Sequence, residues 1–341
     1  MHDVANAAVE PLRLSIAMCT FNAGRYLEEQ LATISVQTRL PDELVVCDDG
    51  SSDATMSQLY AFARVAPYPV RIIQNAQTLG YSRNFAQAIE LCTGEAIILS
   101  DQDDRWHTTR LEKMKNIFLQ DENAMGVFTN GDLMDEQSCP LPGTLWSSFG
   151  FGFEDQERMQ NGEAVQVLVQ RNVVTGMALA IRGSARKYLR SMPQHWPHDS
   201  WLALMLASKG QLRACPEELV TYRVHAKQQI GVPLTGREKL SFLQTHGLRA
   251  YLRSSRERNI REYTREAIQY EALLQAAESN DDLKHAWWFS MARAKTEHAR
   301  RGVRHLQLST IDRIRQVLKY RKEYRHYSPT GSAAFWRDLL L

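Results

Sequence analysis

Hydrophobic and polar positions in the first 130 residues alternate between two patterns. Short apolar runs, typical of buried strands, occur at residues 14–18, 44–47, 70–73, 96–99 and 125–129. Segments with apolar side chains at helical spacing lie between them, at residues 24–37, 54–65, 82–91 and 109–119. This alternation predicts an α/β domain whose mainly parallel sheet is covered by helices on both faces.

The pattern changes twice further along the chain. Residues 131–172 show no clear period, which predicts a long irregular segment with a functional role. Strand and helix patterns return at residues 177–181, 201–208 and 219–224. Beyond Thr235 only helices are predicted, at residues 237–243, 248–277, 283–301 and 311–320. We therefore predict one domain over residues 1–234 and a helical region over residues 235–341.

The distribution of charge changes at the same boundary. Residues 1–234 hold 20 Lys and Arg against 27 Asp and Glu, a net charge of −7, whereas residues 235–341 hold 21 against 12, a net charge of +9. Basic helices of this kind either contact an anionic membrane surface or form a solvated face beside an intramolecular or dimer core. Nucleic acid is not expected as a partner, because no readout module accompanies the charge.

Composition and cysteine usage indicate the setting of the protein. The chain is 44% hydrophobic and 23% charged, as in ordinary globular proteins. Its five cysteines form no C-x-x-C pair, which argues against a disulfide framework or structural zinc and favours a reducing compartment. Because no membrane span or secretory signal is evident, we expect a cytoplasmic protein.

Acidic residues gather where two of the predicted strands end. They are Asp101, Asp103 and Asp104 after the strand at 96–99, and Asp48 and Asp49 after the strand at 44–47. Neighbouring carboxylates repel one another unless a cation lies among them, and their oxygens suit Mg²⁺ or Mn²⁺. Since ligands bind at the carboxyl ends of strands in open sheets, we expect Asp49, Asp101 and Asp103 to converge on one cation. A polar loop with a helix cap is the alternative interpretation.

Four motifs in a fixed order give the chain a family resemblance. The segments LSIAMCTFN (14–22), VVCDDGSSD (45–53), LGYSRN (79–84) and SDQDD (100–104) resemble motifs of family 2 glycosyltransferases, the last of them in the place of the DxD motif. Residues 174–176, 198–201 and 221–225 extend this resemblance to roughly residues 12–232. The motifs SDQDDxW and YRxH are similar to those of bacterial enzymes that build surface polysaccharides such as O-antigen, rhamnosyltransferases included.

The resemblance implies an A-type glycosyltransferase fold, with a nucleotide-sugar half at about residues 12–130 and an acceptor-side half at about residues 131–234. It implies metal-dependent, inverting transfer from a nucleoside-diphosphate sugar, either dTDP-rhamnose or a UDP-sugar, to a hydroxyl of a glycan or lipid-linked acceptor. The implied cofactor is Mn²⁺ or Mg²⁺. Peripheral contact with the inner face of the cytoplasmic membrane and a homodimer are both open interpretations of the basic helices.

The resemblance also implies roles for single residues. Asp103 would bind the metal, Asp101 would contact the ribose or the metal through water, and His225 would complete the metal shell. Asp199 would be the general base for the acceptor hydroxyl. The residues implied in nucleotide-sugar binding are Thr20, Phe21, Asn22, Asp48, Asp49, Gly80, Arg83, Asp101 and Gly176.

Within this set, Phe21 would stack on the nucleobase, Asp48 or Asp49 would accept its N3–H, and Arg83 would neutralise a phosphate. Each role has a structural alternative. Asp104 and Asp199 are typical first-turn or capping residues of helices, Arg83 fits a surface position, and His225 fits an ordinary hydrogen bond.

Three other classes of protein share parts of this pattern. A sugar nucleotidyltransferase would show a glycine-rich phosphate loop with a basic residue, which residues 19–25 do not supply. A non-catalytic nucleotide-sugar-binding or scaffold protein is disfavoured by the joint presence of Asp49, Asp101, Asp103 and Asp199. A phosphoacceptor signalling domain would leave the later motifs unexplained.

Overall fold

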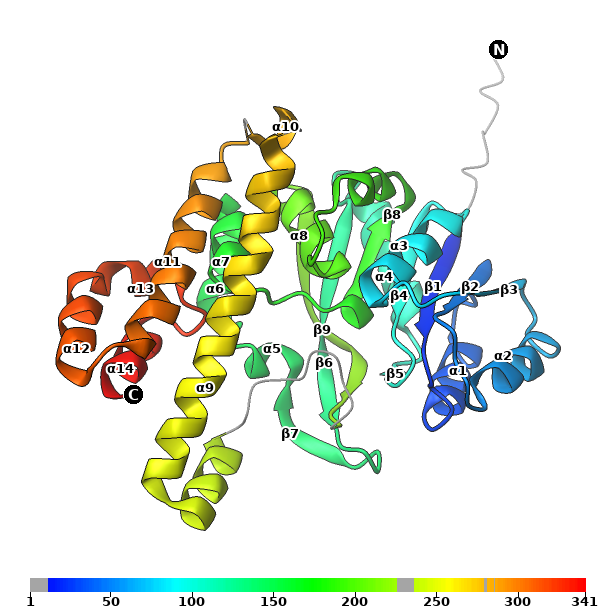
Figure 1. Ribbon diagram of the computed structural model, residues 1–341. Coiled ribbons are helices and arrows are strands. Elements are labelled where there is room, and N and C mark those ends of the chain that lie inside the picture. The colour runs from blue at the N-terminus through cyan, green and yellow to red at the C-terminus, as the bar shows by residue number, and fades with distance from the viewer. Residues whose placement is uncertain (1–11, 226–235, 279–280, 285) are drawn as a thin grey trace. The chain divides into compact units, whose positions relative to one another are not determined.

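The computed structural model describes residues 12–225, 236–278, 281–284 and 286–341 (Figure 1). Its contacts divide the chain into two compact units. The first unit runs to Val127 and includes Gly176–Arg186 and Leu219–Thr221. The second unit comprises Phe128–Thr175, Lys187–Glu218 and Tyr222–Leu341. The predicted boundary between residues 234 and 235 lies outside the described residues, and that division stays a prediction.

A parallel sheet with strand order β3-β2-β1-β4 forms the core of the first unit. Its strands are β1 (Leu14–Thr20), β2 (Glu43–Asp48), β3 (Val70–Gln74) and β4 (Ala96–Ser100). β8 (Leu179–Arg182) extends this sheet antiparallel to β4, and β5 (Arg105–Trp106) pairs with Val220 and Thr221. Every residue of β1, β2 and β4 is buried, as uninterrupted apolar runs predict for strands covered on both faces.

Four helices connect the strands of the first unit, each within three residues of its predicted bounds. They are α1 (Leu27–Ser35), α2 (Thr55–Ala63), α3 (Tyr81–Leu91) and α4 (Arg110–Gln120). α3 packs on β1 and β2 and buries Phe85 and Ile89. In the sheet Thr20 lies beside Asp48 and Met18 beside Ser100, so the carboxyl ends of β1, β2 and β4 share one edge.

Most of β6 (Gly126–Met134) lies in the second unit, because the first unit ends at Val127. β6 pairs with β7 (Pro140–Thr144) and is a neighbour of β9 (Leu212–Arg223) in the sheet. Residues 219–221 of β9 belong to the first unit. The prediction that residues 131–172 are irregular is wrong. Besides the end of β6 and β7, this stretch forms α5 (Leu145–Ser148), α6 (Phe153–Arg158) and α7 (Ala164–Gln170). Every residue of α7 except Gln166 is buried, and a helix buried nearly all round lacks the period that sequence analysis detects.

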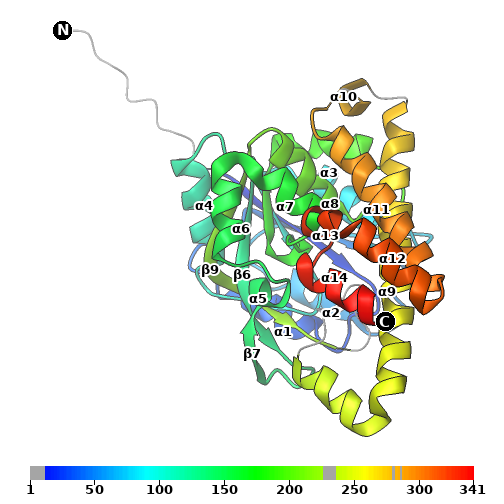
Figure 2. The same cartoon turned by 90° about the vertical axis from the view of Figure 1, so that its left-hand side faces the viewer.

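Beyond residue 235, the described part of the second unit contains six helices: α9 (Gly236–Glu278), α10 (Asp281–Lys284), α11 (Phe289–Gln307), α12 (Thr310–Lys319), α13 (Arg321–Tyr327) and α14 (Ser332–Leu340). α9 and α11 lie side by side in both views (Figures 1 and 2). α9 replaces the two separate helices predicted at 237–243 and 248–277. Among the described helices, none has the length and apolar character needed to cross a bilayer.

A buried carboxylate ties the last helix to two others. Asp338 of α14 is fully buried, and its Oδ2 accepts hydrogen bonds from Tyr263 of α9 at 2.6 Å and Tyr324 of α13 at 3.1 Å. Arg337 Nε donates to Asp338 Oδ1 at 2.8 Å. Because hydrogen bonds and a cation compensate this buried charge, the network joins α9, α13 and α14.

Candidate active site

The turn after β2 is built around the carboxylate of Asp48, which is fully buried. Asp48 Oδ1 accepts from Thr20 Oγ1 at 2.8 Å, and Asp48 Oδ2 accepts from the backbone N–H groups of Gly50 at 3.2 Å and Ser51 at 2.8 Å. Gly50 has φ +88°, the left-handed backbone that a glycine adopts without strain, as the predicted tight turn requires. Thr20 and Asp48 therefore fix the edge of the sheet, and their contact with a nucleobase stays a prediction.

Asp49 holds the loop that leads into α3. Its Oδ1 accepts from Leu79 N at 2.7 Å and Asn75 Nδ2 at 3.0 Å, and its Oδ2 accepts from Gly80 N at 2.9 Å. Gly80 precedes α3 with φ +83°, and a side chain there would meet no atom within 4 Å. Asp49 is thus directed to this loop. Because no three acidic side chains of the described residues are placed to hold a metal ion, the expectation that Asp49 converges with Asp101 and Asp103 on one cation is wrong.

Asn84 and Arg83 lie in the first turn of α3 but differ in their surroundings. The Asn84 side chain is buried, donates to Cys47 O at 2.8 Å and accepts from Asn75 Nδ2 at 2.9 Å. Arg83 is exposed. Asn84 therefore anchors α3 to β2, whereas Arg83 lies where a ligand in solution can reach it.

Phe21 and Asn22 follow β1 at the same edge of the sheet. The Phe21 ring is 46% exposed, so it is free to stack on a flat ligand. Its backbone is held by Gln102, which accepts from Phe21 N at 2.7 Å and donates to Phe21 O at 3.3 Å. Asn22 has φ +49° and accepts from Ser52 N at 3.0 Å. The loops after β1, β2 and β4 are thus connected by side chains of their own residues.

The acidic segment after β4 combines exposed and buried carboxylates. Asp101 and Asp103 are partly exposed, whereas Asp104 is buried. α4 begins at Arg110, so the alternative interpretation of Asp104 as the cap of this helix is wrong. Asp101 and Asp103 are consequently the two acids of this segment that a ligand can reach.

Arg110 is a cation beside these acids that sequence analysis missed. Its side chain is fully buried, with the guanidinium 4.3 Å from the centre of the Trp106 ring. Burial lowers the pKa of Arg110 to about 9, while the charges of Asp104 and Asp101 act in the opposite direction. No local pattern marks an arginine on a helix as buried, so only the fold reveals this charge. The repulsion among the acids is therefore partly offset by the protein itself.

The described residues contain no group of three or more His, Cys, Asp or Glu side chains placed to hold a metal ion. Asp101 and Asp103 offer two carboxylates on one loop. Magnesium is commonly bound by one or two carboxylates together with substrate phosphates and water. This donor set therefore fits an ion shared with a phosphate-bearing ligand. His225 follows β9 in the second unit and is half-buried, and its role as a metal ligand stays a prediction.

Asp199 lies in the first turn of α8 (His198–Ser208), directly after Pro197. It is 9% exposed, and its Oδ1 accepts from the backbone N–H of Ser200 at 2.6 Å. This is a favourable place for a negative charge, because backbone N–H groups point out of the N-terminal turn. Burial lowers the pKa of the neighbouring His198, although the charge of Asp199 opposes the shift. The helix-start interpretation of Asp199 agrees with this geometry, and the role as base stays a prediction.

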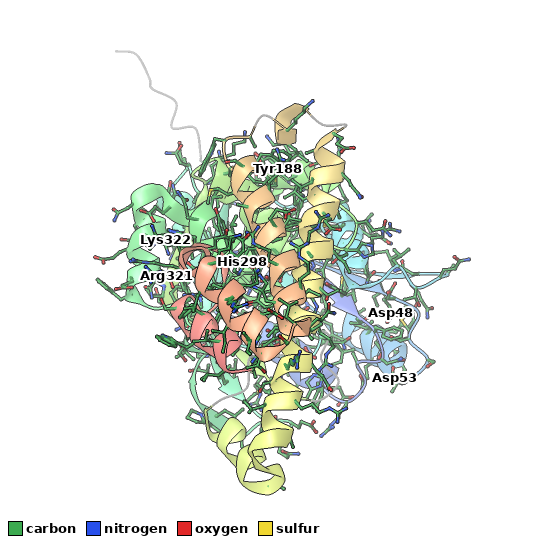
Figure 3. All side chains as sticks on the ribbon, turned by 60° about the vertical axis from the view of Figure 1, so that its left-hand side comes forward. Asp48, Asp53, Tyr188, His298, Arg321 and Lys322 are labelled. Atoms are coloured by element: carbon green, nitrogen blue, oxygen red, sulfur yellow. The ribbon has the colours of Figure 1, made fainter. Side chains whose placement is uncertain are left out.

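An aromatic cluster holds the segment that precedes Asp199. Trp196 is buried, and its Nε1 donates to Gln269 O of α9 at 2.7 Å. Its ring meets those of Tyr270 and Trp201 edge-on, at 5.3 Å and 5.6 Å between ring centres. Trp201 Nε1 donates to the carbonyl of Tyr188, labelled in Figure 3, at 2.8 Å. Helix α9 therefore helps to position the start of α8, which no motif in the sequence indicates.

Gly176, the last predicted residue, is buried in a 3-10 turn (Gly176–Ala178) that leads into β8 of the first unit. This turn packs against β4, the strand that ends in the acidic segment. The strand predicted at 177–181 begins only at Leu179, because the turn occupies its first two positions.

Comparisons with known proteins find similarity over the region that contains these motifs. Residues 15–177 match the model of glycosyl transferase family 2. An uncharacterized glycosyltransferase of Nostoc sp. is 24% identical over 306 residues, 82% of this chain and 87% of the relative. An Escherichia coli UDP-Glc:alpha-D-GlcNAc-diphosphoundecaprenol beta-1,3-glucosyltransferase is 26% identical over 125 residues, 37% of this chain and 48% of the relative.

The fold is also similar to a solved structure, that of S. aureus TarS 1–349 in complex with UDP-GlcNAc. The TM-score is 0.51 at 15% identity, with 96% of this chain and 90% of that chain covered. At this identity the similarity concerns the fold alone, and it confirms the predicted A-type glycosyltransferase fold. The family match identifies residues 15–177 as a glycosyl transferase family 2 domain, and together with the relatives named glycosyltransferases it supports a family 2 glycosyltransferase.

Proposed function

We propose that the protein transfers a sugar from a nucleoside-diphosphate sugar to a hydroxyl of a glycan or lipid-linked acceptor, with inversion at the anomeric carbon. The observation that carries this proposal is the common sheet edge at which Phe21, Asp101 and Asp103 follow adjacent strands. The UDP-GlcNAc complex of TarS and the UDP-glucose donor in the name of the E. coli relative support a nucleotide-sugar donor.

Phe21 stacks on the nucleobase in this proposal, and Asp49 is the better candidate to accept its N3–H. A carboxylate has about four acceptor positions. Asp48 accepts from Thr20, from Gly50 N and from both the N–H and the hydroxyl of Ser51, which uses all of them. Asp49 accepts three hydrogen bonds from the protein, and one position is left for a ligand. Thr20 and Asn22 shape the same pocket for the base.

The donor diphosphate is held, we propose, at Asp101 and Asp103 with Mn²⁺ or Mg²⁺. Asp103 is the direct ligand, Asp101 contacts the ribose or the ion through water, and His225 completes the shell. When bound, the ion stabilises the negative charge on the departing diphosphate. Arg83 contacts the phosphates, Gly80 lets the donor approach the loop before α3 because it carries no side chain, and Gly176 supports the sugar side.

Asp199 acts as the general base in this proposal. It takes the proton of the acceptor hydroxyl, whose oxygen forms a bond to the anomeric carbon as the bond from that carbon to the diphosphate breaks. A single displacement of this kind inverts the anomeric centre and releases the nucleoside diphosphate. Within the family, dTDP-rhamnose or a UDP-sugar is the proposed donor and a bacterial surface polysaccharide the proposed product.

A panel of nucleotide sugars, titrated with and without Mn²⁺, tests this function. We expect one donor to raise the melting temperature in the presence of Mn²⁺, and Asp103→Ala to remove the metal-dependent part of that rise. Glu122→Gln, which changes an exposed acid in the same unit, is the matched control and should behave as the wild type. If a donor binds with metal but no sugar is transferred to any acceptor, the non-catalytic binding protein becomes the better interpretation.

A further inference from the structure

Large hydrophobic side chains are exposed on the last helices of the chain. Of the fifteen such side chains that are exposed in the described residues, five lie within residues 308–340, about a tenth of the chain. Three are more than half exposed: Ile311 at 66%, Trp336 at 60% and Leu340 at 71%. The other two are Leu308 and Leu318. Such a concentration is unusual for a surface that faces water alone.

α12 directs an apolar and cationic face outward. Its buried residues, Arg313 and Val317, lie four positions apart on one side of the helix. Ile311, Arg315 and Leu318, at positions i, i+4 and i+7, lie on the opposite side and are all exposed. The outward face of α12 is therefore itself amphipathic.

α14 repeats this arrangement beside α12. Ala334 and Asp338 are buried on one side of α14, and Trp336 and Leu340 are exposed on the other. α14 packs against both α12 and α13, and the three helices are adjacent in Figures 1 and 2. The exposed apolar side chains thus belong to one packed cluster of helices.

The exposed charges of these helices are mostly positive. Asp312 is the only exposed acid among the described residues of α12–α14, because Asp338 is buried and the partly buried Glu323 pairs with Arg301. Figure 3 labels two of the exposed cations, Arg321 and Lys322, at the start of α13. The exposed cations are Arg315, Lys319, Arg321, Lys322 and Arg325. We call these five cations, with Ile311, Leu318, Trp336 and Leu340, the α12–α14 surface.

We propose that the α12–α14 surface docks the protein on an anionic lipid bilayer. Indole rings favour the headgroup region, and exposed Leu and Ile side chains gain free energy when they leave water for the acyl boundary. Lys and Arg are attracted to anionic headgroups, and the two contributions together give stable peripheral binding. The role of this docking rests on the proposed function: it would bring the enzyme to a lipid-linked acceptor, which lies in such a bilayer.

Sedimentation of the full chain with vesicles tests the docking without any donor or metal. We expect binding to phosphatidylcholine vesicles that contain phosphatidylglycerol, weak binding to pure phosphatidylcholine, and a loss of affinity as salt is added. Arg321→Gln with Lys322→Gln should weaken binding roughly twenty-fivefold, since each cation contributes about fivefold. Trp336→Ser with Leu340→Ser should weaken it at least about tenfold.

The matched control removes two exposed apolar side chains elsewhere: Tyr60→Ser with Val65→Ser, 54% and 78% exposed in the first unit, should bind vesicles as the wild type does. Circular dichroism verifies that each variant is folded, and titration with the nucleotide sugar verifies that its donor site is intact. No binding by the wild type, or equal binding by Trp336→Ser/Leu340→Ser, overturns the proposal. So does self-association that this variant abolishes, because the surface would then bind a second copy.

Discussion

The side-chain amide of Gln102 is hydrogen bonded twice to the backbone of Phe21, accepting from its N–H at 2.7 Å and donating to its carbonyl at 3.3 Å. Gln102 lies between Asp101 and Asp103, so one side chain connects the loop of the exposed ring with the loop of the accessible acids. Ligand sites gain precision when such supporting contacts hold their residues in place.

Gln102→Ala should therefore weaken donor binding more than it weakens the fold. Two hydrogen bonds of about 1 kcal/mol each are lost, which corresponds to roughly tenfold to thirtyfold in the donor dissociation constant. Gln102→Glu separates the two hydrogen bonds, because a carboxylate can accept from Phe21 N but cannot donate to Phe21 O. Calorimetric titration with the donor measures both. An unchanged dissociation constant in Gln102→Ala would show that Phe21 is positioned without this amide.

Arg110 should matter for stability, because it is the buried positive charge next to Asp104 and Asp101. Arg110→Met removes the cation and keeps much of the apolar volume. Truncating one partner of a buried charge pair typically costs about 3–5 kcal/mol. We expect a loss of this size in the free energy of unfolding by urea. Lys115→Met on the same helix α4, half-buried and without a described hydrogen bond, should change it by less than about 0.5 kcal/mol. Equal effects of the two substitutions would contradict this role.

The part of the site that was predictable is the part that the chain encodes locally. β1, β2 and β4 are apolar runs that end in polar residues, and such runs have few other structures available. The position of Asp101 and Asp103 at a sheet edge follows directly from this local pattern.

The partners of the site residues were not predictable, because they depend on contacts between distant residues. Asp49 is hydrogen bonded to N–H groups thirty and thirty-one residues further along the chain, those of Leu79 and Gly80. Trp196 contacts Gln269 and Tyr270 of α9. No sequence motif links Asp49 to the loop at Leu79 and Gly80, or Trp196 to α9. Hydrophobic patterns report which residues are buried but not which of them meet.

Asp199→Asn should separate binding from turnover if Asp199 is the base. The amide cannot take the proton of the acceptor hydroxyl, so we expect kcat to fall by about 10²–10⁴ while donor binding is nearly unchanged. Ser200→Ala is the control, because it removes only the hydroxyl that donates to Asp199 Oδ1 at 3.2 Å and leaves the carboxylate. Steady-state kinetics and calorimetry report the two properties. Equal loss of donor affinity and turnover in Asp199→Asn would argue for a structural role at the start of α8.

His305 should make the stability of the protein depend on pH. It is 5% exposed on α11, stacked on the ring of Tyr320 at 5.8 Å between ring centres. Burial, with the nearby charge of Arg301 adding to it, lowers the pKa of His305 to about 4. In the unfolded chain the pKa of a histidine is about 6.5. Between these values the unfolded state binds a proton that the folded state does not, so stability is lost as the pH falls through this window.

The size of this loss gives the test. From about pH 7 to about pH 5 the histidine contributes a loss of roughly 2 kcal/mol in the free energy of unfolding. His305→Gln cannot titrate, so urea unfolding of this variant at the two pH values should show a loss smaller by that amount. Carboxylates titrate in both proteins, and their contribution cancels when the two losses are subtracted. If the wild type and His305→Gln lose equal stability, then His305 is protonated as easily in the folded protein as in the unfolded chain, and the predicted effect of its burial on the pKa is contradicted.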